Sequence, residues 1–205
     1  MLIYINLNKI WEDILMEKLE TLLIENPVIA AIRSDKDLEK VISSNVLIVF
    51  VLYGSIINLK MICERLKKAG KVVFVHVDLI EGLKGDHTGL LFIKECGEPD
   101  GIITTRATNI KNGKKLGFCV IQRIFAVDSL SLESGIRNIQ SVLPDAVEIM
   151  PGLASKIIKT MGTQVRVPII AGGLIQSKKD IMESIGAGAM AVSTSKQELW
   201  SLSQE

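Results

Sequence analysis

Eight short apolar runs recur along the chain, and a segment long enough for a helix follows each of them. The runs are Val28 to Ile32, Val46 to Leu52, Val72 to Val77, Gly101 to Thr104, Phe118 to Phe125, Ala146 to Met150, Val167 to Ala171 and Ala189 to Ser193. Apolar runs rich in β-branched residues are typical of parallel strands buried on both faces. The segments between them carry apolar residues at helical spacing, as Leu59, Ile62 and Leu66 show.

Strands that alternate with helices predict a parallel sheet with right-handed crossover connections. Eight repeats allow the sheet to close, so we expect an α/β fold, a small (β/α)8 barrel of the TIM type. The 205 residues, of which 48% are hydrophobic, can bury one substantial core but do not suggest two domains. We therefore expect residues 1–205 to form a single domain.

An amphipathic stretch precedes the first run and extends to about Asn26. Its apolar face is formed by Leu15, Leu19, Leu22 and Leu23. This pattern predicts an N-terminal helix that could close the bottom of the barrel. Met16 is a second plausible translation start, so residues 1–15 are either part of the fold or an extension outside its core.

Positive and negative side chains nearly balance, with a formal net charge of +1 at pH 7. A protein that binds the phosphate backbone of a nucleic acid usually has a stripe of basic side chains, and none is obvious here. One small cluster, beside the expected barrel mouth, consists of Lys111, Lys114 and Lys115, for which a solvated helix face is the simpler interpretation. No apolar stretch reaches about 18 residues and no secretory signal is recognisable. We expect a cytoplasmic protein with no membrane partner.

Three cysteines without C-x-x-C spacing and two histidines do not suggest a metal site, and we expect no metal and no cofactor.

The most informative motif joins the segment from Pro168 to Ile175 with the segment from Gly188 to Ser195. Each is an apolar run that ends in small residues, which are Gly172 and Gly173 in the first and Ser193, Thr194 and Ser195 in the second. Small residues let several backbone N–H groups converge on a phosphate, as the loops after strands seven and eight do in TIM barrels. A short helix from Ser195 to about Leu202 could add its N-terminus. The alternative is that the two glycines only form a tight turn.

Polar residues at the other expected strand ends extend this mouth. The candidates for ligand binding there are Asp78, Thr105, Arg106, Glu148 and Gly152. Arg106 can reach a phosphate or carboxylate in fork geometry. Asp78 could bind a ligand hydroxyl, or act as a base with His76 nearby, or merely cap a helix.

Glu148 interrupts an apolar run, where burial of an unpaired carboxylate would cost several kcal/mol. It therefore needs a partner, and Arg123 in the preceding run is the nearest by topology. The pair is either structural or part of the ligand site. The sixth run contains no lysine, where many Schiff-base barrel aldolases place theirs, so a ready-made catalytic set is absent.

Several segments, in this order, carry a family resemblance. They are Asn-Pro-Val-Ile-Ala-Ala-Ile, Val-His-Val-Asp-Leu-Ile-Glu-Gly-Leu, Gly-Ile-Ile-Thr-Thr-Arg, Ile-Gln-Arg-Ile-Phe, Glu-Ile-Met-Pro-Gly, Ile-Ile-Ala-Gly-Gly-Leu-Ile and Ala-Val-Ser-Thr-Ser-x-x-Glu-Leu-Trp. From about Glu17 to Leu202 the chain resembles the glycerol uptake operon antiterminator regulatory proteins. It departs from their pattern at Ala107, where proline is expected after the arginine.

The resemblance implies a regulatory barrel, not an enzyme, that binds the effector glycerol-3-phosphate. When liganded, it would bind the leader mRNA of glycerol catabolic operons so that transcription passes a terminator. If the family's site is carried over to this chain, the phosphate ligands are Gly172, Gly173, Ser193 and Thr194. Asp78, Arg106 and Glu148 are then candidates for the glycerol end. Lys111, Lys114 and Lys115 are candidates for RNA contact. The residues alone leave open an enzyme acting on a small phosphorylated sugar or polyol, as well as the RNA element and the oligomeric state.

Overall fold

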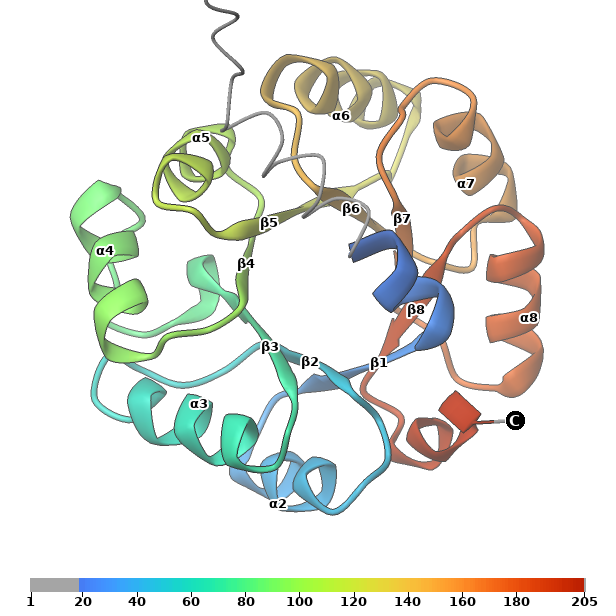
Figure 1. Cartoon of the computed structure of the whole chain (residues 1–205). Helices are drawn as coiled ribbons and strands as arrows, with labels where there is room; N and C mark the ends of the chain where they lie inside the picture. Colours follow the sequence, from blue (N-terminus) through green and yellow to red (C-terminus); the bar gives the residue numbers. More distant parts are fainter. Residues whose placement is uncertain (1–18, 205) are drawn as a thin grey trace, which may run out of the picture.

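Eight parallel strands close into a barrel in a computed structural model that describes residues 19–204 (Figure 1). They are β1 (Val28–Ile32), β2 (Ile48–Val51), β3 (Val72–His76), β4 (Gly101–Thr104), β5 (Cys119–Phe125), β6 (Ala146–Met150), β7 (Ile169–Gly172) and β8 (Ala191–Thr194). Each strand pairs with the next along the chain, and β8 pairs with β1. The predicted TIM-type barrel is confirmed.

Helices surround the barrel on its outside (Figure 1). They are α2 (Asp35–Ile42), α3 (Leu59–Lys68), α4 (His87–Cys96), α5 (Ala107–Lys115), α6 (Ser129–Val142), α7 (Ser155–Gly162) and α8 (Lys178–Gly186). Two 3-10 segments, η1 (Val77–Leu79) and η2 (Gln197–Gln204), follow β3 and β8. The helices run antiparallel to the strands, so each begins near the carboxyl end of one strand and ends near the start of the next.

The seventh and eighth strands begin two residues later than the sequence pattern predicts. Pro168 explains the first shift, because proline has no N–H group to donate to a sheet. Its carbonyl oxygen still accepts a hydrogen bond from Val147 N at 2.9 Å. Gly188, with φ +111°, marks the turn before the eighth strand.

Alternation along the strands divides the core into an inner and an outer part. Inside the barrel, side chains such as Ile29, Phe50, Ile121 and Ile170 form one apolar cluster. On the outside, the other face of each strand packs against the helices. Interior positions nearest the carboxyl ends of the strands are polar instead, and these ends form the barrel mouth.

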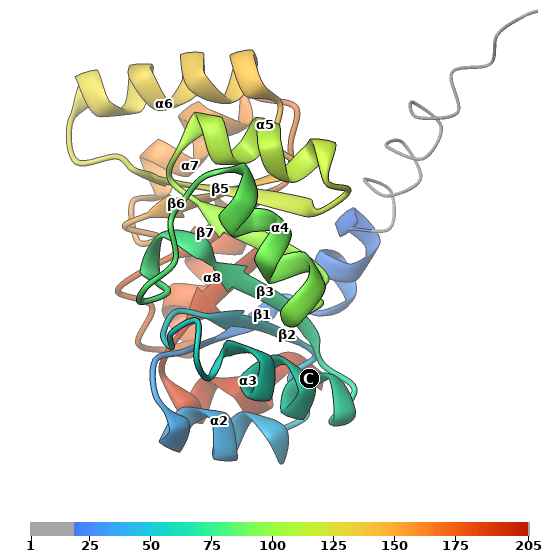
Figure 2. The same cartoon turned by 90° about the vertical axis from the view of Figure 1, so that its left-hand side faces the viewer.

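A helical segment at residues 19–25 closes the other end of the barrel. Leu19 and Leu23 are only 5% and 1% exposed and belong to the inner cluster, while Leu22 packs against it. Figure 2 shows this segment and the mouth at opposite ends of the barrel. The predicted plug is confirmed for these residues; Leu15 and the predicted extension at residues 1–15 lie outside the described residues.

Within residues 19–204, no helix has the length and apolar character needed to span a membrane.

Candidate functional site

A small pocket opens at the mouth where the loops after β7 and β8 meet. Its walls are Ala31, Arg33, Leu52, Arg123, Glu148, Met150, Gly173, Leu174, Ile175, Gln176, Ser193, Thr194 and Ser195. The pocket volume is about 40 Å³, and since one water-sized group needs about 10–15 Å³, it accommodates about three oxygen-sized groups below the rim. The structure thus brings together the two small-residue loops that the sequence singled out.

The loop after β7 presents a row of unused backbone donors. Gly173 and Leu174 have φ of +75° and +62°, a left-handed conformation that is costly for leucine. Neither N–H group donates to any residue in the described part of the chain. Farther along the loop, beyond Ile175, the N–H groups of Gln176 and Ser177 donate to Asp180 Oδ2 at 2.8 Å each, in a capping box that begins α8. The capping box therefore fixes one side of the loop.

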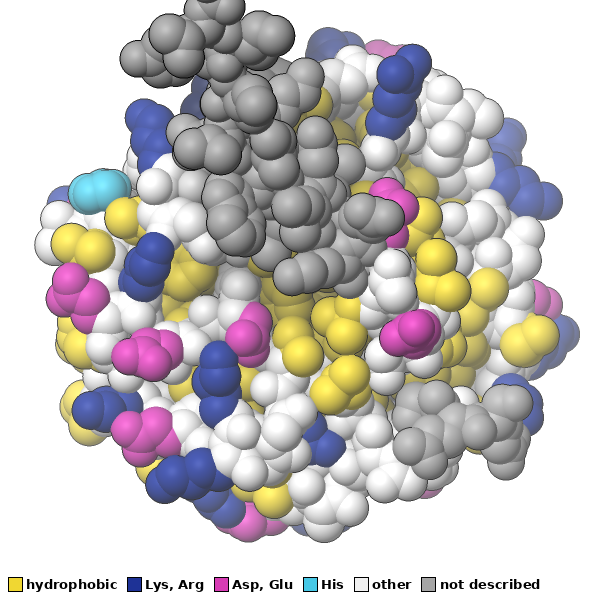
Figure 3. Space-filling model, viewed as in Figure 1, with side chains coloured by type: hydrophobic (Ala, Val, Ile, Leu, Met, Phe, Trp, Pro, Cys, Tyr) yellow, Lys and Arg dark blue, Asp and Glu magenta, His cyan; other side chains and the backbone are white. Residues whose placement is uncertain are grey.

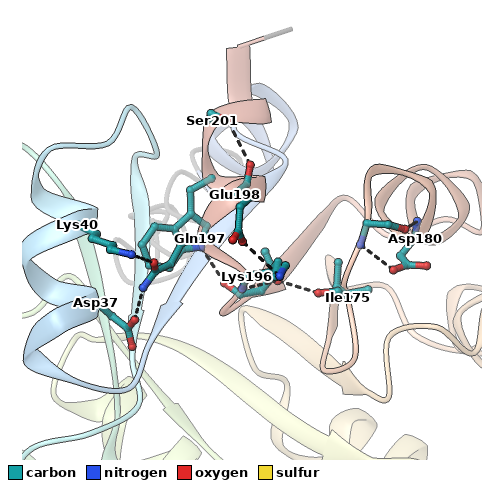
Figure 4. Close-up of polar contacts among 11 residues, drawn as sticks. Asp37, Lys40, Ile175, Asp180, Lys196, Gln197, Glu198 and Ser201 are labelled. Carbon is teal, nitrogen blue, oxygen red and sulfur yellow. Dashed lines mark hydrogen bonds and ion pairs between the residues drawn. The ribbon is translucent and has the colours of Figure 1, made fainter.

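The loop after β8 is tied to the loop after β7 through one hydroxyl group. Thr194 Oγ1 donates to Ile175 O at 2.9 Å and accepts from Lys196 N at 3.0 Å. Gln197 Nε2 donates to Asp37 Oδ1 at 2.6 Å, which joins this loop to α2 (Figure 4). The hydroxyl of Thr194, a predicted phosphate ligand, is thus occupied within the protein.

Ser195 was predicted to start a helix at this loop, but η2 begins at Gln197 and is a 3-10 segment. Ser195 is exposed, and its N–H group makes no hydrogen bond to residues 19–204. It remains available as a ligand donor beside Gly173 and Leu174.

Gly152 and Gly172 serve close backbone packing. Gly152 N donates to Gly172 O at 2.5 Å, and a Cβ on Gly152 would lie 2.8 Å from Gly172 N. A Cβ on Gly172 would lie 2.5 Å from Glu148 Oε1. A side chain at Gly152 would push the loop after β7 out of place, and a side chain at Gly172 would displace the carboxylate of Glu148. Neither Gly152 nor Gly172 lines the pocket, so their contact with a ligand stays a prediction.

A buried ionic chain forms the floor of the pocket. Arg123 Nε donates to Glu148 Oε2 at 2.5 Å, and Ser193 Oγ donates to Glu148 Oε1 at 2.5 Å. Glu148 is fully buried, and Arg123 and Ser193 are 6% and 3% exposed. The predicted pair is present, and both carboxylate oxygens have donors. Among the described residues, Nη2 of Arg123 is buried without a hydrogen-bond partner.

His76 lies inside the barrel near this chain, at 2% exposure. Burial, followed by the nearby positive charge of Arg123, lowers the pKa of His76 to about 4. The side chain is therefore neutral near pH 7 and adds no charge to the floor. Its Nδ1 has no partner within the described residues.

The predicted residues Asp78, Thr105 and Arg106 form a second cluster, outside the pocket walls. Asp78 Oδ2 accepts from Thr104 Oγ1 at 2.9 Å, Thr105 N at 2.7 Å and Thr105 Oγ1 at 3.1 Å. Its Oδ1 accepts from Asn109 Nδ2 at 3.3 Å and pairs with Arg106 Nε at 3.5 Å. We call this group the Asp78 cluster. Its carboxylate is already used to join β3 to β4 and α5.

The predicted position of the three lysines beside the mouth is wrong. Lys111, Lys114 and Lys115 belong to α5, which runs away from the mouth, so its last turn lies at the closed end of the barrel. Lys114 donates to Leu143 O at 2.8 Å and pairs with Asp145 at 3.5 Å. On this end, Lys and Arg side chains lie scattered among acidic and uncharged groups (Figure 3). Their contact with RNA stays a prediction.

Three further residues line the pocket. Arg33 does so from its position directly after a strand, and its side chain has no ion pair or hydrogen bond with residues 19–204. Arg123 was expected as the partner of Glu148, in a pair that is either structural or part of the ligand site, and it lines the pocket together with Glu148. Sequence reasoning missed Leu174, because its left-handed conformation had no sequence signal. Groups of three or more His, Cys, Asp or Glu that could hold a metal ion do not occur in the described chain.

Comparisons with known proteins identify the family. A model of the glycerol-3-phosphate responsive antiterminator family matches residues 28–200. The uncharacterized protein YgcP of Escherichia coli is 38% identical over 184 residues, which span 90% of this chain and 96% of that protein.

Two solved structures are similar over most of their length. The glycerol uptake operon antiterminator regulatory protein of Listeria monocytogenes is 35% identical, with a TM-score of 0.82 over 84% of this chain and 94% of that one. A related protein of Thermotoga maritima is 34% identical, with a TM-score of 0.76 over 85% and 98%. Aldolases at 13–14% identity share the barrel fold alone. The match of the family model and the identity to these relatives place the chain in the glycerol-3-phosphate responsive antiterminator family.

Proposed function

We propose that this protein senses glycerol-3-phosphate and, when it holds this effector, binds the leader mRNA of glycerol catabolic genes and promotes transcription antitermination. The effector is its small-molecule ligand, and no cofactor takes part. The pocket at the loops after β7 and β8 is the effector site.

One observation carries the effector part of this proposal: the pocket walls contain hydrogen-bond donors that have no acceptor among the described residues. The N–H groups of Gly173, Leu174 and Ser195 and Nη2 of Arg123 are unused by the described residues. Leu174 and Ser195 are exposed, whereas Nη2 of Arg123 is buried, and a buried donor without a partner is costly. A ligand with several clustered oxygens, such as a phosphate ester, would satisfy them, and the small volume suits a short carbon chain better than a nucleotide.

The regulatory part requires two protein states. An effector changes RNA affinity only by binding those two states with different affinity. The segment 108–115 belongs to α5 and is helical without a ligand. The loop between η1 and α4 and the loop after β7 are the better candidates, since both lie at the mouth.

Leader-RNA binding tests this function directly. Fluorescence anisotropy of a labelled leader RNA would be followed with and without glycerol-3-phosphate, at several salt concentrations because phosphate contacts make affinity salt-dependent. Glycerol-3-phosphate should strengthen binding, whereas inorganic phosphate and an RNA of scrambled sequence serve as controls. Equal and negligible binding under both conditions would contradict the proposal.

The aldolase-like barrels leave an enzyme as the alternative. It has weaker support, because β6 carries Glu148 and no lysine and the carboxylate of Asp78 is held by protein donors. Turnover of triose or pentose phosphates that is lost in Asp78→Asn would favour it. No turnover across such a panel would retire it.

A further inference from the structure

We propose that the ligand has a fixed orientation in the pocket, with its phosphate at the two loops beside Arg33 and its hydroxyl end on Arg123. This inference rests on the proposed function and deepens it, because it assigns each arginine to one end of the ligand. Arg123 becomes the residue that selects polyol phosphates over other phosphate esters, and Glu148 the residue that positions it.

The charges of the two arginines differ in how far they are already balanced. Arg123 is neutralised by Glu148 through a 2.5 Å contact. Arg33 is exposed and has no carboxylate partner within the described part of the chain. An unbalanced cation attracts a dianion, whereas a balanced one still donates hydrogen bonds to a neutral oxygen. The phosphate therefore belongs to Arg33 and the hydroxyl groups to Arg123.

The strand order places the two arginines accordingly. β1 pairs directly with β8, with Ala30 opposite Thr194, so the residue that follows β1 stands beside the phosphate loops. Arg123 lies on β5, three strands away from β8 around the barrel. Its side chain reaches into the same pocket, where the carboxylate of Glu148 stands between Arg123 and Ser193 of β8. With the phosphate at the loops after β7 and β8, the opposite end of the ligand is the part that contacts Arg123.

The hydrogen-bond inventory adds a second, independent reason. Arg123 is more than nine-tenths buried and lines the pocket, and its Nη2 is the donor left without a partner. Glu148 uses its two oxygens on Arg123 Nε and Ser193 Oγ, which holds the guanidinium in one orientation. A hydroxyl oxygen of the ligand completes this set, and a ligand without hydroxyl groups leaves Nη2 unsatisfied.

Calorimetric titration with two ligands tests the orientation. Glycerol-3-phosphate and propyl phosphate share a phosphate and a three-carbon chain, but only the first has hydroxyl groups. The wild-type protein should prefer glycerol-3-phosphate by about 10-fold or more, as expected for a hydrogen bond to a charged group. In Arg123→Lys, which keeps the charge beside Glu148 but not the second donor, this preference should fall to near unity with propyl phosphate affinity unchanged.

Arg33→Met should instead weaken the binding of both ligands by the same factor and preserve the preference for glycerol-3-phosphate. Arg137→Met, at an exposed arginine on α6, is the matched control and should change neither affinity. If Arg123→Lys does not fold, Arg123→Met combined with Glu148→Gln removes both buried charges and should give the same loss of preference.

Three results would overturn the orientation. Arg123→Lys could weaken both ligands equally, which would place the phosphate on Arg123. It could leave the preference intact, or Arg33→Met could abolish the preference. A wild-type protein that binds neither ester would overturn the proposed function itself, and this outcome is distinct because no variant is needed to see it.

Discussion

Two polar clusters lie at the same mouth, and they differ in how far the protein supplies partners for their charged side chains. In the Asp78 cluster, the carboxylate accepts from Thr104, Thr105 and Asn109. In the pocket, Arg123 keeps one donor without a partner among the described residues. Both clusters consist of strand-end residues of the same chemical kind. The first holds loops in place, whereas the second has unused hydrogen-bonding capacity for a ligand.

This difference shows which question to ask of a polar strand end. Its position at the mouth does not separate structural from ligand-binding groups, because both clusters occupy it. The number of partners already supplied by the protein separates the charged groups Asp78 and Arg123, since buried polar groups are almost always paired. Asn109 Oδ1 of the Asp78 cluster also lacks a partner within the described residues, but Asn109 does not line the pocket. A group that breaks this rule in a pocket is the better candidate for ligand contact.

The largest effect should come from the pocket floor. Glu148→Ala leaves Arg123 buried without its carboxylate, so we expect the free energy of unfolding to fall by about 3–5 kcal/mol. Urea denaturation measures it. Glu39→Ala is the control, because Glu39 contacts Arg65 at 2.7 Å but on the exposed surface, where ion pairs stabilise little. Equal losses in the two variants would mean that the floor is not a desolvated site.

The next effect concerns His76, which ends β3 just before the η1 segment that carries Asp78 and is buried near Arg123. Its pKa of about 4 in the folded protein is below the ordinary 6.5. Stability is therefore fully present above pH 6.5 and falls as the pH drops toward 4, because the unfolded chain takes up the proton first. At about 1.4 kcal/mol per pH unit, the loss approaches 3 kcal/mol.

Urea unfolding at pH 7.5 and 4.5 checks this, with His76→Gln removing that part of the pH dependence. Carboxylates also titrate in this range, so the readout is the difference between the wild-type protein and the variant. His87→Gln, on the exposed start of α4, is the matched control. An unchanged pH dependence in His76→Gln would show that burial and the charge of Arg123 do not lower the pKa of His76.

A smaller loss of stability should come from the Asp78 cluster. Asp78→Ala deprives Thr105 N and Asn109 Nδ2 of their acceptor, so we expect a loss of about 2 kcal/mol with no change in glycerol-3-phosphate affinity. Urea denaturation and calorimetric titration provide the two readouts. A large loss of affinity at unchanged stability would reverse the comparison between the two clusters.

The barrel was predictable because periodicity is a property of the chain itself. The runs at β1, β4 and β6 coincide with the observed strands, and the pairing of Glu148 with Arg123 follows from the cost of a buried lone charge. The roles of the polar residues were less accessible. Whether Asp78 or Arg123 has an unused hydrogen-bond acceptor or donor depends on contacts between strands. The spacing of residues along the chain does not encode these contacts.

Backbone conformation was the other property that the sequence did not reveal. Leu174 has φ +62° in the pocket loop, whereas Leu143 has φ +49° at the C-cap of α6, and both are exposed leucines with no sequence signal for a left-handed backbone. The two positions form a natural pair, since the conformation is nearly the same and only one of them lies at the pocket.

The smallest effect should come from replacing these two leucines with glycine. Relief of the left-handed conformation gains about 1–2 kcal/mol, and the added chain entropy costs about 0.5–1 kcal/mol, so each variant should gain up to about 1 kcal/mol in urea denaturation. Leu143→Gly should leave glycerol-3-phosphate affinity unchanged. Leu174→Gly should weaken it about two- to fivefold, because a looser loop must be ordered on binding. If both variants bind equally well, the strained leucine does not preorganise the donors of the pocket.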